Sequence, residues 1–94
     1  MERLEAIALL TACRPLADRL AAEGVDLQLT PDDLFNLRGF NEVWLYNDGN
    51  WLDDPVVRRQ SGLSRSDIAM LHFIAGMQAR EKMRRLHEAG EPLE

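Results

Sequence analysis

The chain has 94 residues, of which 46% are hydrophobic and 29% are charged, and its formal net charge is −5. This length predicts a single domain, residues 1–94, and no apolar run approaches the ~20 residues that a membrane span needs. The single cysteine, Cys13, cannot form an internal disulfide, and the first residues lack a secretory signal. We therefore expect a cytoplasmic protein that does not bind membranes.

The charge is unevenly distributed along the chain. Residues 1–54 carry four basic and eleven acidic side chains, whereas residues 55–88 carry seven basic and three acidic ones. The two halves can neutralise each other inside one folded domain, which is the simpler interpretation. Alternatively, the basic half can form a local surface for nucleic acid or for an acidic protein.

The start of the chain predicts an interrupted helix. Residues 2–23 have helical composition, and their apolar residues recur near helical spacing. Pro15 removes one backbone donor and restricts the residue before it, so we expect a kink or break near residues 11–14. Gly24 then provides a natural stop.

Strand-like patterns follow in the middle of the chain. Residues 25–29 alternate apolar and polar side chains, and residues 40–46 are rich in β-branched and aromatic side chains. The Asn-Asp-Gly-Asn sequence at residues 47–50 is typical of a tight turn. A short returning strand at residues 51–52 would complete a hairpin.

Three further helices are expected. Two short ones, at residues 30–39 and 54–62, each begin with a capping residue followed by proline and end at a glycine. A long helix, residues 64–89, ends the chain, and its Ser64 and Asp67 have the spacing of a capping box.

The predicted fold class is therefore α+β and mostly helical. It comprises an N-terminal helix kinked near Pro15, two or three short strands with a hairpin at residues 47–50, short helices, and one long C-terminal helix. Such a small sheet needs a helix packed on it for stability.

The long helix predicts two contact surfaces. A narrow stripe of mostly apolar residues runs the full length of the helix. The residues in its middle have small side chains, which lets another helix approach closely. Gly76 costs a helix about 1 kcal/mol relative to alanine, so we expect it to have a packing role. A bulkier face covers only the first three turns and is expected to pack on the sheet. The residues predicted to bind a partner or form a dimer on these surfaces are Ile68, Met70, His72, Phe73, Ala75, Gly76, Met77, Ala79, Arg80, Met83 and Arg84.

Neither catalysis nor metal binding is indicated. The pairs Asp32/Asp33 and Asp53/Asp54 sit at predicted helix starts, where capping explains them. The two histidines and the one cysteine have no zinc spacing, and the chain has no phosphate loop or nucleophile motif. We expect a protein that is not an enzyme and that uses no metal and no cofactor.

The leading hypothesis is a small regulatory protein that binds another protein, as an inhibitor, anti-activator or adaptor. Methionine-rich helix faces suit adaptable protein recognition, and a basic helix end can steer an acidic partner. The long helix is expected to pair with a second copy, which predicts a homodimer. Short acidic chains without motifs are common among accessory regulators of bacteria and phages.

The alternative hypothesis is a DNA-binding regulator with a helix-turn-helix at residues 55–71. Two helices there would flank a glycine-bearing turn, a form typical of this motif. The residues expected to contact DNA are Arg58, Arg59, Ser64, Arg65 and Ser66. The net acidity of the chain and the apolar character of the second helix make nucleic acid the second choice of partner.

Overall fold

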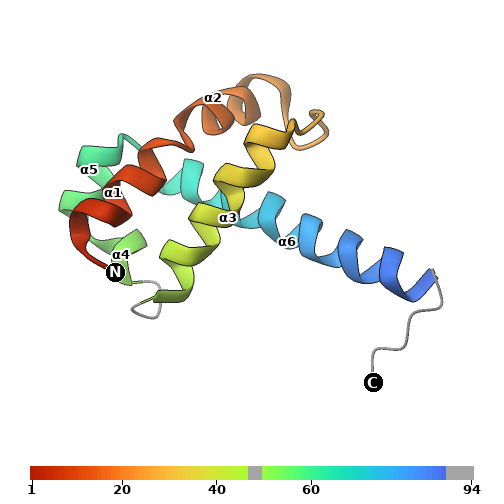
Figure 1. Ribbon diagram of the computed structural model, residues 1–94. Helices are drawn as coiled ribbons and strands as arrows, with labels where there is room; N and C mark the ends of the chain where they lie inside the picture. The colour runs from red at the N-terminus through yellow and green to blue at the C-terminus, as the bar shows by residue number, and fades with distance from the viewer. Residues whose placement is uncertain (47–49, 89–94) are drawn as a thin grey trace.

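The computed structural model describes residues 1–46 and 50–88. Every regular element in these ranges is a helix: α1 (Arg3–Thr11), α2 (Arg14–Glu23), α3 (Pro31–Leu45), α4 (Asn50–Asp53), α5 (Pro55–Ser61) and α6 (Arg65–Glu88). The five shorter helices gather into one body, and α6 crosses that body and extends beyond it (Figure 1). Among the described residues, no helix combines the length and apolar content that a membrane crossing requires.

The predicted strands are wrong, and the α+β class with them. Helix α3 continues through the predicted strand at residues 40–46 as far as Leu45, and residues 51–52 belong to α4. Residues 25–29 form an irregular connection. Of the turn predicted at residues 47–50, residues 47–49 lie outside the described part of the chain, and Asn50 begins α4. The described part of the chain is an all-helical fold.

Gly39 explains why α3 was divided in two by the prediction. A Cβ atom at this position would lie 3.1 Å from Leu9 Cδ2 of α1, so the glycine lets the two helices cross closely instead of ending α3. Phe40 and Val43, which the alternation of a strand would place on opposite faces, are both fully buried on one side of the helix. Packing in the core therefore overrides their strand preference.

The alternation in residues 25–29 has a different basis from the one predicted. Val25, Leu27 and Leu29 are half-buried and pack against the core. Arg19 of α2 donates hydrogen bonds to the Gln28 carbonyl at 2.9 Å and to the Asp33 carboxylate at 2.6 Å. The segment is thus held by side chains, since the described residues provide no neighbouring strand to pair with it.

The helix boundaries follow the capping signals. The predicted break before Pro15 is present, because α1 ends at Thr11 and α2 begins at Arg14. Thr30 and Asp33 form a reciprocal capping box at the start of α3, and the Asp54 side chain caps α5. The long helix spans Arg65–Glu88, close to the predicted 64–89.

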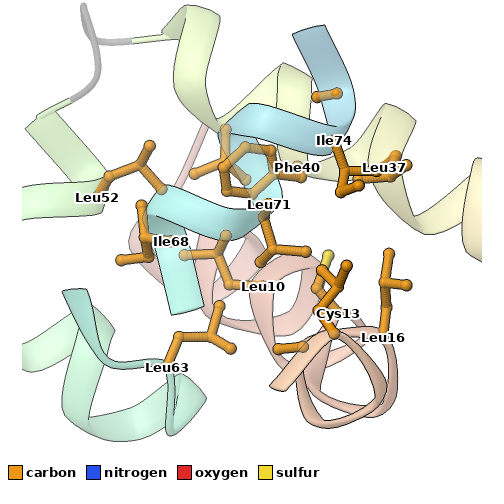
Figure 2. Packing of buried hydrophobic residues seen from close by; sticks show 14 of the residues in the cluster. Leu10, Cys13, Leu16, Leu37, Phe40, Leu52, Leu63, Ile68, Leu71 and Ile74 are labelled. Atoms are coloured by element: carbon orange, nitrogen blue, oxygen red, sulfur yellow. The ribbon is translucent and has the colours of Figure 1, made fainter. Parts of the chain in front are cut away.

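The core collects side chains from all six helices. Figure 2 shows Leu71 of α6 packed among Leu10, Phe40 and Ile68. Beyond Ala75, no described residue of α6 is buried. The first half of α6 is therefore part of the core, and its second half, which has no buried residue, is called the uncovered half below.

Candidate partner-binding surface

The start of α6 is firmly fixed. Gly62 adopts a φ of 75°, which suits glycine and turns the chain between α5 and α6. Arg14 donates a hydrogen bond to the Gly62 carbonyl at 2.9 Å. Ser64 and Asp67 form the predicted capping box, with N–H···O distances of 2.9 and 3.0 Å. These contacts hold the direction of the whole helix relative to the body.

The residues by which α6 packs on the core do not coincide with either of the two predicted surfaces. Its buried residues are Ile68, Leu71, Ile74 and Ala75. Leu71 is fully buried although neither predicted surface contained it. Ile68 and Ala75, predicted to bind a partner, are core residues of the chain itself. The bulky face does not cover the body as expected, because Phe73 is 51% exposed.

The side of α6 that points away from the core carries exposed apolar residues. We call it the outer face and define it as Phe73, Gly76, Met77, Arg80, Met83 and Arg84. Phe73, Met77 and Met83 are 51%, 36% and 52% exposed. Helical spacing places all six residues opposite Leu71. All of them are among the predicted partner-binding residues, whereas Met70 and His72 are half-buried beside this face and Ala79 is exposed next to it.

Gly76 has no evident role within the chain. A Cβ atom added there would meet only the Arg80 guanidinium, at 3.6 Å, which is ordinary van der Waals contact. Nothing in the described structure therefore requires glycine at this position. Glycine inside a helix costs about 1 kcal/mol relative to alanine, and no contact within the described chain offsets that cost at Gly76.

Ion pairs stabilise the uncovered half of α6 from within. Arg84 donates hydrogen bonds to Glu81 and Glu88, and Arg85 donates one to Glu81. The hydrogen bond from Arg84 is the main reason that the pKa of Glu81 lies below its usual value. These one-turn pairs support an otherwise isolated helical segment. Arg80 and Lys82 form no ion pair with any described residue.

The acidic and basic halves of the chain do not neutralise each other through ion pairs. Arg3 pairs with Asp54, and the remaining pairs lie within residues 14–33 or within residues 81–88. Across residues 1–46 and 50–88, no ion pair joins the first half to the second. Direct ion pairs among these residues therefore do not supply the neutralisation that the simpler interpretation of the charge pattern expects.

His72 sits at the contact between α3 and α6. Its ring lies edge-on to Phe40, with ring centroids 5.0 Å apart, and edge-on to Trp44 at 5.3 Å. Burial lowers the pKa of His72, which favours the neutral imidazole. Trp44 is 46% exposed and lines a hollow of about 350 Å³ with Arg65 and Ala69. His72 is thus a packing residue with one edge near the surface.

Cys13 has the properties of a core residue. Its side chain is fully buried, and its Sγ donates a hydrogen bond to the Asn36 carbonyl at 3.3 Å. Burial raises the pKa of this thiol to about 11, so it is protonated at neutral pH. It is therefore a poor nucleophile. Among the described residues, there is no group of three or more histidine, cysteine, aspartate or glutamate side chains that could hold a metal ion.

The predicted helix-turn-helix has the expected local form but unusual packing. Arg59, Ser64, Arg65 and Ser66 are exposed, and Arg58 is half-buried with its Nε atom lacking a hydrogen-bond partner. The main packing partners of α5 are α1 and α4, whereas those of α6 are α2 and α3. A DNA-reading unit normally packs its two helices on each other.

Exposed residues of α3 were missed by sequence reasoning. Phe35 and Leu45 are 71% and 66% exposed on the side of α3 that faces away from the core, and Leu34, which is 41% exposed, lies at the border of that side toward α6. Dividing residues 31–46 into a helix and a strand hid the fact that these residues share one face. Reading Gly39 as a helix-crossing residue would have revealed this face.

Comparison of the chain with protein families, with curated proteins and with solved structures finds no match.

Proposed function

We propose that this protein is a non-enzymatic regulator that acts by binding another protein through the outer face of α6. The observation that carries the proposal is the exposure of Phe73, Met77 and Met83 around a glycine that the chain itself does not need. Met and aromatic side chains are favoured at protein interfaces. An isolated helix half is also poorly stable in water, so a partner that covers it contributes to its stability.

A second copy of the chain is the simplest partner, as the sequence predicts. Two copies related by a two-fold axis would use the same outer face on both sides. If the helices cross at Gly76 in antiparallel orientation, Arg80 of one copy lies near Phe73 of the other. The basic ends around Arg84 and Arg85 then lie apart. A parallel pair would bring these like charges together, which is unfavourable.

A tagged protein recovered from host lysate, with and without nuclease, tests the regulatory role. We expect a protein partner that survives nuclease treatment and is lost from the Phe73→Ser variant. The Arg65→Ala variant should retain this partner, because Arg65 lies outside the outer face. Partner recovery that does not change in Phe73→Ser would contradict the assignment of the outer face.

DNA binding is the second candidate function, and the exposed start of α6 favours it. Ser64, Arg65 and Ser66 are exposed directly after a glycine turn, where a recognition helix would meet bases. This function predicts that Arg65→Ala abolishes recovery of DNA and that nuclease removes everything recovered with the protein. That result would replace the protein-binding proposal.

A further inference from the structure

A groove runs between α3 and α6 on the side of α6 that carries Leu71 and Ala75. Its volume is about 420 Å³. The buried side chains of Leu37 and Ala75 line it, together with the exposed side chains of Leu34 and Ala79. Arg38 of α3 and Lys82 of α6 line its edges and are exposed.

The shape of the groove suits a helix. Ala75 and Ala79 lie one helical turn apart on α6, so the wall is low on that side, and leucines of α3 form the other wall. The axes of packed helices lie about 8–10 Å apart, and small side chains at the contact favour the shorter distances. Apolar residues of an incoming helix at every third or fourth position would fill such a groove.

The charge of the groove indicates which charge the residues beside the apolar stripe of that helix should carry. Arg38 and Lys82 are the charged residues of its lining, and both are basic. Neither forms an ion pair with another described residue. A docked helix with Asp or Glu on both flanks would meet these cations, whereas a basic helix would be repelled. The second half of this chain's own α6 is basic, so it is a poor occupant.

We propose that the groove between α3 and α6 binds an amphipathic helix with acidic flanks from another protein. This inference rests on the proposed protein-binding function but uses a surface distinct from the outer face. It specifies the chemistry of the partner as a leucine-rich apolar stripe bordered by carboxylates.

Two synthetic peptides of about five helical turns test the proposal. Both carry leucine on one face, and one has glutamate flanks where the other has lysine flanks. Fluorescence anisotropy with the full chain at low ionic strength should show at least about tenfold tighter binding of the glutamate peptide. Equal affinity for the two peptides, or no binding of either, would overturn the proposal.

Charge reversal in the groove provides the specific control. The Arg38→Glu/Lys82→Glu variant should prefer the lysine peptide. The Arg59→Glu/Arg65→Glu variant has the same change in net charge but lies outside the groove, so it should keep the original preference. If both variants lose the glutamate peptide equally, net charge rather than the groove determines binding and the proposal is wrong.

The two proposals can fail separately. Ala79→Trp should fill the groove and block the glutamate peptide without altering contacts made by the outer face. Gly76→Leu should disturb the outer face and leave peptide binding in place. Loss of peptide binding in Gly76→Leu but not in Ala79→Trp would show that the peptide does not bind in the groove, and the proposal would be wrong.

Discussion

At the scale of single residues, two glycines inside helices have opposite structural roles. Gly39 lies where α3 crosses α1, with no room for a larger side chain without movement of Leu9. Gly76 lies on the outer face of α6, with room for a side chain. The first glycine serves the packing of this chain, whereas the second has no packing role among the described residues and, under the proposed function, would serve contact with another molecule.

These roles predict opposite effects on stability. Gly39→Leu should overpack the α1–α3 crossing and lower the free energy of unfolding by about 1–3 kcal/mol. Gly76→Ala should be neutral or raise it by up to about 1 kcal/mol, because alanine favours the helix. Urea denaturation followed by circular dichroism measures both changes. Equal destabilisation by the two substitutions would contradict the distinction.

His72 predicts a pH dependence of stability. Burial lowers its pKa below the ordinary 6.5, so the unfolded chain binds the proton more readily than the folded chain. Its contribution to stability is therefore complete above pH 6.5 and is lost as the pH falls below that value. The lowered pKa values of Asp33, Asp54 and Glu81 act only at more acidic pH.

The test compares urea midpoints at pH 7.5 and pH 5.5. The wild-type midpoint should fall on acidification, and His72→Gln should reduce this fall. His87→Gln changes the exposed second histidine and should behave like the wild type. A fall of the same size in His72→Gln would show that another group causes it.

At the scale of elements, α6 consists of a covered half and an uncovered half. The covered half includes Leu71 and Ile74 in the core, whereas the uncovered half depends on ion pairs around Glu81 and Arg84. Amides of residues 68–75 should therefore exchange with solvent far more slowly than those of residues 80–88 in dilute protein. Hydrogen exchange followed by mass spectrometry measures this contrast. Uniform protection along α6 in the monomer would contradict the division.

Some elements could be predicted from the sequence because their signals are local. The caps at Thr30, Asp54 and Ser64 and the break before Pro15 depend on residues within one turn of chain. The course of α3 could not be predicted in this way. Aromatic and β-branched residues at 40–46 resemble a strand, and Gly39 resembles a stop until Leu9 of α1 is seen beside it.

The surfaces of α6 were only partly predictable for a related reason. The periodicity of a sequence identifies apolar stripes on a helix, but it does not show which part of a stripe is covered by the other helices. The core side centres on Leu71, and Ala75 is the last residue of α6 that is buried. The exposure of Phe73, Met77 and Met83 depends on that tertiary limit, and so does the groove beside α3.

At the scale of the whole molecule, charge and apolar exposure coincide. The acidic first half and the basic second half share no ion pair among the described residues. The basic, uncovered end of α6 extends beyond the helical body (Figure 1). Under the proposed function, the exposed apolar residues of this surface would contact the partner, and its unpaired cations would attract an oppositely charged one.

Sedimentation equilibrium of the wild type and of Gly76→Leu tests the central claim, pairing through the outer face, most directly. We expect a wild-type dimer whose dissociation constant rises at least about tenfold in Gly76→Leu, a change of about 1.4 kcal/mol. Ala8→Leu adds the same side chain to an exposed position of α1 and should leave the dimer unchanged. A wild type that stays monomeric at all concentrations, or an unchanged dissociation constant in Gly76→Leu, would contradict the account.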